Sequence, residues 1–346
     1  MINDIFINIA GFIKSIFEWV GLGDILTNLG MAVVYFVAII AFILLNVMII
    51  VWLERRVSAF MQERRGPNRV GPFGLLQSLN DVVKLATKEP IIPKAVDKPL
   101  YKLAPILVFT TTMLLYAVLP FGKGMAAANI NVGLLYFISI SSTTTISLLM
   151  AGWGSNNKYS LLGGMRTVAQ MISYEIPLAF SMLGVIMITG TLNFSEIVVA
   201  QKSVWFILLQ PVAFIIFFIS GTAELNRAPF DMPEAEQEIV AGFHTEYSGI
   251  RFAFFYLAEY ANLFSMSALG ATLFLGGWQG PILPSWIWFI GKVYLMIFLF
   301  LWVRWSLPRL RMDRMMKLNW KVLIPIAIAN ILLTGIGIKI YQYFVS

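Results

Sequence analysis

The sequence predicts an all-α integral membrane protein with about eight transmembrane helices. Of its 346 residues, 59% are hydrophobic and only 12% are charged, whereas soluble domains carry about 25% charged residues. Its apolar stretches are also long enough to cross a bilayer, which takes about 20 residues at a rise of 1.5 Å each. Membrane β-strands would instead alternate apolar and polar residues over short segments. We therefore expect residues 1–346 to form a single helical membrane domain.

Eight apolar stretches are expected to span the membrane as a bundle over residues 30–341. They are residues 30–53, 102–122, 132–152, 162–189, 204–222, 252–276, 285–304 and 321–341. Residues 1–28 repeat isoleucine and phenylalanine at helical spacing, which predicts an amphipathic helix in the membrane interface. Residues 75–88, in the first loop, place leucine and valine on one helical face and lysine and asparagine on the other. This pattern predicts a second amphipathic helix.

The distribution of basic residues predicts the orientation, because cytoplasmic loops carry an excess of lysine and arginine. Lys292 falls within a span, in its outer half, and we expect it to snorkel toward the interface. One side would hold only Lys14, Lys123, Lys202 and Lys339. The other basic residues lie on the opposite side, in the loops that connect spans 1 and 2, 3 and 4, 5 and 6, and 7 and 8. We name these loops 1–2, 3–4, 5–6 and 7–8. We expect a multi-pass protein of the cell (inner) membrane, with these loops cytoplasmic and both termini on the opposite side.

Composition also excludes several kinds of site. The chain has no cysteine and a single histidine, His244. Thiolate-held iron–sulfur clusters, haem held by two histidines and the usual zinc sites are therefore excluded within this chain. We expect no metal and no bound cofactor, so any electrons must come from a partner. The net charge of +7 reflects topology, and nucleic-acid binding is not expected. His244 is expected to be an ordinary polar loop residue.

The first loop is basic and turn-rich. It opens with Glu54, Arg55 and Arg56 and continues through Arg64 to two Gly-Pro pairs within residues 66–72. These pairs favour turns. Taken alone, such a loop is typical of contact with anionic lipid headgroups.

The fifth loop is acidic, against the trend of its side of the membrane. Arg227, Phe230 and two prolines lie among its acidic residues, which are Glu224, Asp231, Glu234, Glu236, Glu238 and Glu246. One interpretation is a solvated loop. The other is proton handling, because carboxylates clustered among apolar residues have raised and coupled proton affinities.

Two carboxylates are expected inside the membrane. Glu175 follows Tyr174 in the fourth span, and Glu259 lies about two turns into the sixth. A charge at the bilayer centre costs at least about 2.5–3.5 kcal/mol, so such residues are by default functional. The alternative is a neutral carboxyl group that is hydrogen-bonded between helices.

The chain carries a series of motifs in order along residues 30–341, at residues 54–56, 62–72 (QERRGPNRVGP), 158–163, 173–175, 224–231 (ELNRAPFD), 233–236, 246–248 and 258–260. These motifs resemble those of the family of the H subunit (mitochondrial subunit 1) of proton-pumping NADH:quinone oxidoreductase, respiratory complex I. Residues 223–226 depart from the Glu-Thr-Asn-Arg start that is common in the family. They keep Glu224, and Arg227 follows, so we expect the role of this segment to survive.

The resemblance implies a membrane subunit that forms much of a quinone tunnel and couples quinone reduction to proton translocation. It implies partners, namely peripheral-arm iron–sulfur subunits, antiporter-like membrane subunits and lipids, with FMN and iron–sulfur clusters in those partners. No residue would be catalytic in the isolated chain. Implied tunnel residues are Arg55, Arg64, Arg227, Phe230 and Arg304. Implied proton-path residues are Glu54, Tyr174, Glu175, Glu224, Asp231, Glu234, Glu236 and Glu259.

Two alternatives stay open. One is the membrane subunit of an energy-converting hydrogenase-type complex, which would conduct ions without quinone and would accompany a nickel–iron subunit. The other is a secondary transporter, which would show inverted repeats with broken helices at matching positions. The sequence shows no such symmetry.

Overall fold

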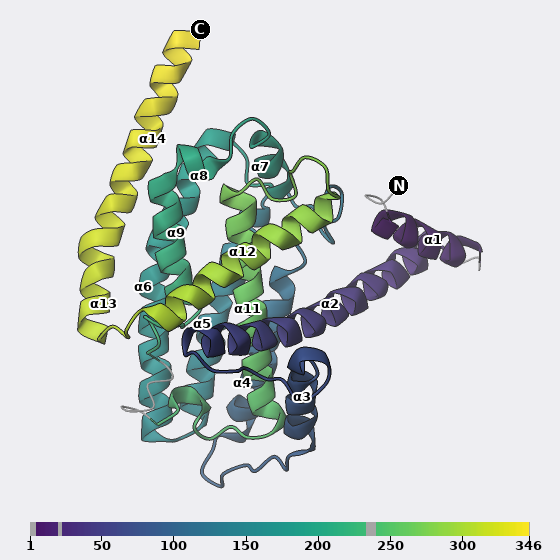
Figure 1. Ribbon diagram of the computed structural model, residues 1–346, viewed down its shortest axis with the longest axis vertical. Helices are drawn as coiled ribbons and strands as arrows, with labels where there is room; N and C mark the ends of the chain where they lie inside the picture. Colours follow the sequence, from purple (N-terminus) through teal and green to yellow (C-terminus); the bar gives the residue numbers. More distant parts are fainter. Residues whose placement is uncertain (1–4, 20–22, 233–239, 346) are drawn as a thin grey trace.

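The computed structural model describes residues 5–19, 23–232 and 240–345, and helices make up almost all of the regular structure in these ranges (Figure 1). The long helices follow the predicted apolar stretches. In order, the elements are α1 (Ile5–Trp19), α2 (Asp24–Met61), η2 (Pro72–Gly74), α3 (Gln77–Thr87), α4 (Lys98–Leu115), α5 (Gly133–Gly154), α6 (Lys158–Thr189), α7 (Phe194–Ala200), α8 (Phe206–Leu209), α9 (Pro211–Glu224), η3 (Gly242–His244), α11 (Ile250–Phe274), α12 (Ser285–Ser306), α13 (Met312–Leu318), η4 (Asn319–Leu323) and α14 (Ile324–Val345).

Each of the eight predicted spans contains a helix, but only some of these helices are long and apolar enough to cross a membrane by themselves. Within the described ranges five meet that requirement, namely α2, α5, α6, α12 and the continuous stretch Met312–Phe344. Helices α4, α9 and α11 do not. Helix α11 carries Arg251, Glu259 and Asn262, and these polar residues lower its hydropathy.

Several predicted spans have different bounds in the structure. Helix α2 extends beyond the predicted 30–53 at both ends, and residues 24–28 of the predicted interfacial segment belong to it. Two other spans change at or near a proline. The span at 204–222 is divided into α8 and α9 at Gln210, whose backbone (φ −131°, ψ 54°) is not helical. Pro211 follows, and a proline disfavours helical backbone in the residue before it. The span at 102–122 ends at Leu115, short of Pro120 and Gly122. In both cases the helix stops near a proline.

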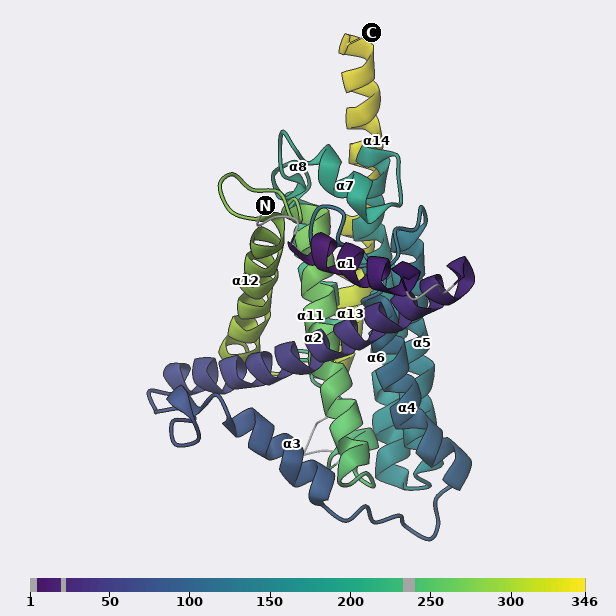
Figure 2. The ribbon, with the colours of Figure 1, turned by 90° about the vertical axis from the view of Figure 1, so that its right-hand side faces the viewer.

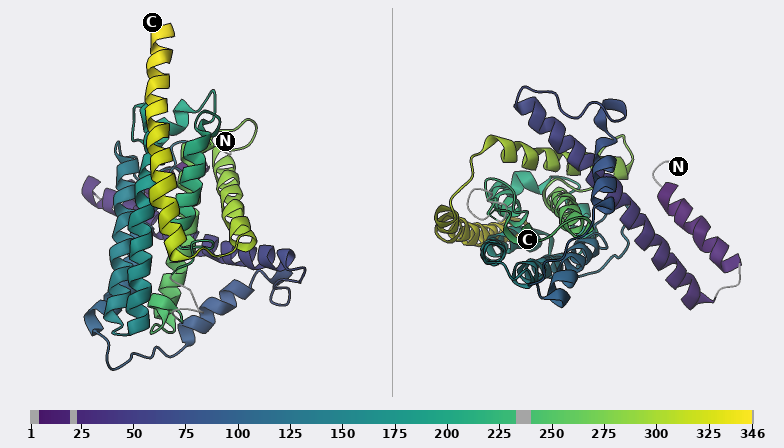
Figure 3. Two further views of the ribbon diagram at one scale, coloured as in Figure 1. Left: turned by 90° about the vertical axis from the view of Figure 1, so that its left-hand side faces the viewer. Right: turned by 90° about the horizontal axis from the view of Figure 1, so that it is seen from below.

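A bundle of α4, α5, α6, α9 and α11 forms the core, with the long α2 crossing it obliquely (Figures 1 and 2). Helix α11 lies at its centre, and its second half is buried continuously from Leu263 to Phe274. Helix α1 lies beside the first half of α2, and both project beyond the bundle (Figure 3). Helix α3 lies below α2, against α2 and α11 (Figure 2).

Candidate functional site

Four charged side chains from four segments meet where α2 crosses the bundle. Arg227 Nη1 lies 2.9 Å from Glu54 Oε2, and Arg227 Nη2 lies 3.1 Å from Glu259 Oε1. Arg304 Nη1 lies 2.5 Å from Glu54 Oε1. We call Glu54, Arg227, Glu259 and Arg304 the ion cluster. It joins α2, the turn after α9, α11 and α12, and its formal charges sum to zero.

Arg227 is the centre of the ion cluster. Its side chain is only 1% exposed, and its guanidinium also lies over the Tyr260 ring, 4.6 Å from the ring centroid. Burial disfavours its charged form, but Glu54 and Glu259 outweigh that effect and raise the pKa of Arg227 above its usual value. Arg227 is therefore a permanent cation that orients two carboxylates.

The turn that presents Arg227 is held by Gln170 of α6, a residue that the sequence did not single out. Its Nε2 donates to the carbonyl oxygens of Ala223 (2.7 Å) and Phe230 (2.8 Å) and to Asn226 Oδ1 (3.2 Å). Asn226 has φ 51°, a left-handed conformation that asparagine tolerates better than most residues. One buried amide thus fixes both ends of the 223–230 turn.

Removing this amide is expected to loosen the turn. Gln170→Met keeps the length of the side chain but removes its hydrogen bonds to the carbonyl oxygens of Ala223 and Phe230. Each carbonyl keeps one backbone donor, Asn226 N at 3.1 Å and Met232 N at 3.0 Å, so the cost is that of two lost hydrogen bonds, about 0.5–1.5 kcal/mol each. We expect the assembled protein to lose about 1–3 kcal/mol of stability, measured by thermal denaturation. Gln342→Met, at an exposed position of α14, is the matched control and should change stability by less than about 0.5 kcal/mol.

Tyr174 and Phe230, both predicted site residues, lie together beside this turn. Their ring centroids are 5.3 Å apart, and both side chains are buried. The Tyr174 hydroxyl donates to the carbonyl oxygen of Met315, 3.0 Å away. This contact links the turn to the helix α13 that precedes α14.

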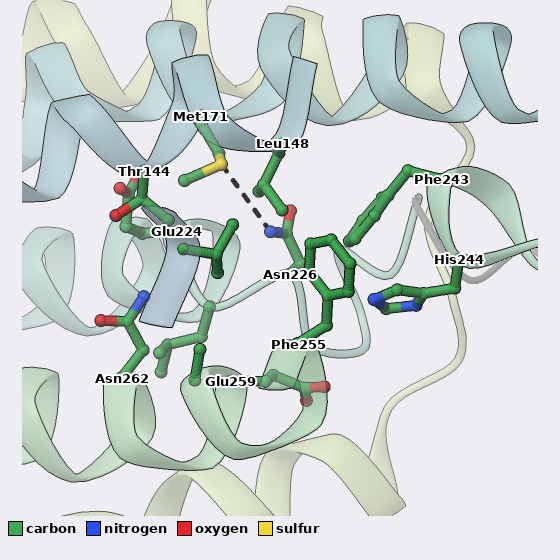
Figure 4. A pocket seen from close by; sticks show the side chains of 13 residues that line it. Thr144, Leu148, Met171, Glu224, Asn226, Phe243, His244, Phe255, Glu259 and Asn262 are labelled. Atoms are coloured by element: carbon green, nitrogen blue, oxygen red, sulfur yellow. Dashed lines mark hydrogen bonds between the residues drawn. The ribbon is translucent and has the colours of Figure 1, made fainter. Parts of the chain in front are cut away.

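A small cavity of about 50 Å³, lined by apolar side chains and by several polar ones, lies behind the ion cluster, between α4, α5, α6 and α11 (Figure 4). Glu224 and Glu259 both line it, together with Thr144, Asn226 and Asn262 among others. Glu224 is 5% exposed, and within the described part of the chain its Oε2 has no hydrogen-bond partner. The cavity thus joins the acid at the end of α9 to the acid of α11.

Glu175 continues this acidic row into α6. Its carboxylate accepts a hydrogen bond from the Ser142 hydroxyl of α5 and interacts electrostatically with Glu224. Three predicted proton-path acids, Glu175, Glu224 and Glu259, therefore follow one another through the interior. Asp231 also interacts electrostatically with Glu259.

His244 differs from the expected polar loop residue, because it lines this cavity among aromatic rings. Its ring centroid lies 3.9 Å from that of Phe243 and 5.2 Å from that of Phe255, and Figure 4 shows it below Phe243 and beside Phe255. The loop can approach α6 this closely because Gly163 has no side chain. A Cβ at that position would lie only 2.5 Å from Gly242 Cα. Burial lowers the pKa of His244 to about 3.

This lowered pKa gives the assembled protein an acid-sensitive stability. Unfolded histidine binds a proton below about pH 6.5, but folded His244 does not until about pH 3, so stability falls as the pH drops through 6.5. At pH 5.5 the loss is about 1 kcal/mol. We expect His244→Asn to lose less stability than the parent between pH 7.5 and 5.5 in thermal denaturation. Equal losses in both would contradict a buried neutral imidazole.

Arg55 and Arg64, two predicted tunnel residues, lie outside the ion cluster. Arg55 Nη1 lies 2.6 Å from Asp81 Oδ2 of α3, and this pair borders a second cavity of about 60 Å³ between α2, α3 and α11. Arg64 is exposed, and its Nε donates to Gln62 in the same loop.

Two further predicted residues, Glu234 and Glu236, lie outside the described residues. Among the described residues, no group of three or more histidine, cysteine, aspartate or glutamate side chains could hold a metal ion. Lys292, which we expected to snorkel toward the interface, lies inside the protein, where its side chain reaches the loop before α12. It is 6% exposed, its Nζ donates to the Gln279 carbonyl at 2.7 Å, and it lies 4.5 Å from the Trp205 ring centroid.

Apolar helices that bury a charge-balanced cluster and a row of acids define a helical integral membrane protein with an ionisable interior. The model of the NADH dehydrogenase family matches residues 34–335. The chain is 47% identical to the NADH-quinone oxidoreductase H subunit of Carboxydothermus hydrogenoformans, over 98% of each chain. It is 54% identical to the corresponding protein of Bacillus cytotoxicus, over 89% of this chain and 92% of that one. The chain belongs to the family of NADH-quinone oxidoreductase H subunits.

Proposed function

We propose that this chain is the membrane subunit of a complex I-type NADH:quinone oxidoreductase that forms much of the quinone tunnel and couples quinone reduction to proton translocation. The ion cluster is the observation that carries the proposal, since it connects the turn after α9 to a row of buried acids. NADH oxidation would belong to partner subunits that carry FMN and iron–sulfur clusters. Peripheral-arm and antiporter-like subunits would complete the complex.

In this proposal the tunnel lies on the α2 side of the ion cluster. The cavity between α2, α3 and α11, bordered by Arg55, would be part of the route by which quinone enters from the lipid. Arg227, Arg304 and Phe230 would surround the inner part of the tunnel, and Arg64 would face the peripheral arm. Arginine suits an anionic quinone species because its charge is permanent and its donors are planar.

Protons would take the acidic row. Glu54, Glu259, Glu224 and Glu175 lead from the ion cluster into the bundle, with Asp231 and Tyr174 beside them. Glu234 and Glu236 would belong to the same loop. Neighbouring carboxylates titrate as a group, so a change in quinone charge at the ion cluster would change proton occupancy along the row.

The proposal includes a topology of eight spans in one domain. Helices α4, α9 and α11 would cross the membrane as members of the bundle. Helix α11 is enclosed by protein in its second half, whereas α4 and α9 would each present one apolar face to the lipid, for example Ile106 and Ile215. Helices α1 and α3 would lie in the interface, because α3 exposes Leu79, Val82 and Val83 on one side. Loops 1–2, 3–4, 5–6 and 7–8 would be cytoplasmic, with both termini outside.

Purification of the complex through a tagged copy of this chain tests the proposal. The purified complex should contain flavin and iron–sulfur subunits. A photoreactive quinone should label peptides of α2, α3 or the 223–232 segment, and excess quinone should suppress that labelling. A nickel–iron subunit together with no quinone labelling would instead favour the hydrogenase-type complex.

A further inference from the structure

A large apolar cavity of about 400 Å³ lies between α1, α2, the segment 121–127 and α12. It is separate from the ion cluster, since Phe42 precedes Glu54 by twelve residues, about 18 Å along a helix. All of its lining residues are uncharged, and they include Ile39, Phe42, Phe121, Met125 and Ile290. The proposed quinone and proton routes do not use it.

Aromatic packing and backbone hydrogen bonds hold the wall of this cavity in place. The Phe121 ring packs edge-on against Phe42, at 5.1 Å between centroids, and against Phe289 at 5.8 Å. Backbone hydrogen bonds close the segment on itself, from Phe121 N to Met125 O (3.0 Å) and from Met125 N to Gly122 O (3.0 Å). Aromatic packing and these bonds keep the cavity open.

The size and chemistry of the cavity suit a hydrocarbon chain. An apolar cavity of about 150 Å³ stays free of water and binds benzene, and this one is larger. It follows α2 from Tyr35 to Phe42, two helical turns or about 10 Å. In a membrane, the acyl chains of the surrounding lipids are the apolar groups that can enter such a cavity.

Basic residues at the rim suit a phosphate headgroup. Lys123 immediately precedes the lining residue Gly124 and is exposed. No ion pair of Lys123 is found within the described ranges. Lys14 lies one helical turn after the lining residue Ala10, but it is 3.7 Å from Glu18 and is partly neutralised. Lys123 is therefore the main cation available at the rim.

We propose that this cavity binds one acyl chain of an anionic glycerophospholipid whose phosphate contacts Lys123. Such a lipid would fill the space between α2 and α12 and attach α1 to the rest of the protein. Binding requires no turnover, so the proposal stands or falls independently of the proposed quinone chemistry.

The acyl chain can be mapped by photolabelling. The intact purified complex is reconstituted with phosphatidylglycerol that carries a diazirine in its acyl chain, and labelled peptides are sequenced. We expect labels at 121–127 and 286–290. Ala38→Trp fills the cavity and displaces several methylenes, which should lower this labelling by more than about tenfold. Ala329→Trp, on the exposed face of α14, is the matched control and should not lower it.

The headgroup has its own control pair. Lys123→Gln should lower labelling at these peptides about fivefold, as expected for one lysine facing an anionic lipid, while Lys339→Gln should leave it unchanged. Absence of label, or equal labelling in Ala38→Trp, overturns the site. Competition by quinone but not by unlabelled phosphatidylglycerol overturns the phospholipid assignment in favour of an isoprenoid tail. Labelling that does not depend on Lys123 overturns the headgroup contact.

Discussion

Replacing Arg227 by methionine is expected to destabilise the assembled protein by about 3–5 kcal/mol, the usual cost of removing one partner from a buried ion pair. Glu54 and Glu259 would lose the guanidinium that lies 2.9 and 3.1 Å from them. Arg304 alone cannot balance two carboxylates. Thermal denaturation and native electrophoresis of the purified complex measure the effect as a lower melting temperature and a smaller assembled fraction.

Three further variants make this test specific. Arg227→Met combined with Glu259→Gln removes one charge of each sign, so it should recover a large part of the lost stability. Arg227→Lys keeps the charge but not the planar fork, and it should lie between the parent and Arg227→Met. Arg311→Met breaks an exposed pair with Asp313 and should cost less than about 1 kcal/mol. If Arg227→Met were as mild as Arg311→Met, the ion cluster would have no structural importance.

The helical framework was predictable because it depends on long apolar stretches. All eight predicted spans contain a helix, and both predicted amphipathic segments are helical as well. Two of the boundary errors arose near prolines. Pro211 follows the break between α8 and α9, and α4 ends before Pro120. Hydropathy averages over such breaks, so it finds the stretches but not their ends.

The ion cluster was predictable only as a set of separate charges. Glu54 and Arg227 are 173 residues apart, and one sequence does not say which helices become neighbours. Helix phase also separates adjacent residues, since successive side chains point about 100° apart. Glu54 therefore faces inward, whereas Arg55 reaches Asp81 on α3. Gln170 carries no charge and belongs to no charged motif, so nothing drew attention to it.

Replacing Glu224 by glutamine is expected to lower proton-coupled quinone reduction by about a hundredfold, within the range that a lost proton-transfer group costs. Glutamine has nearly the same shape, so the cavity and the assembly should survive. It cannot carry the proton that Glu224 would exchange with Glu175 and Glu259 across the cavity. Quinone reduction and membrane potential are measured together in vesicles that contain the intact complex.

Two comparisons separate this effect from a general defect. Oxidation of the electron donor by a water-soluble artificial acceptor bypasses the membrane subunits and should be unchanged in Glu224→Gln. Glu196→Gln, at an exposed acid on α7 that accepts a hydrogen bond from Thr191, should reduce quinone at the parental rate. Normal turnover and potential in an assembled Glu224→Gln complex would remove Glu224 from the proton path.

The zero net charge of the ion cluster determines how it responds to a voltage across the membrane. Moving one elementary charge through the full potential costs about 2.3 kcal/mol per 100 mV. Two arginines and two glutamates that shift together carry no net charge across the field, so such a shift needs almost no electrical work. Once Glu259 gains a proton, the same shift carries one positive charge. Voltage would then oppose or assist the motion only in the protonated state, which makes the proton, rather than the protein, the species that the field acts on.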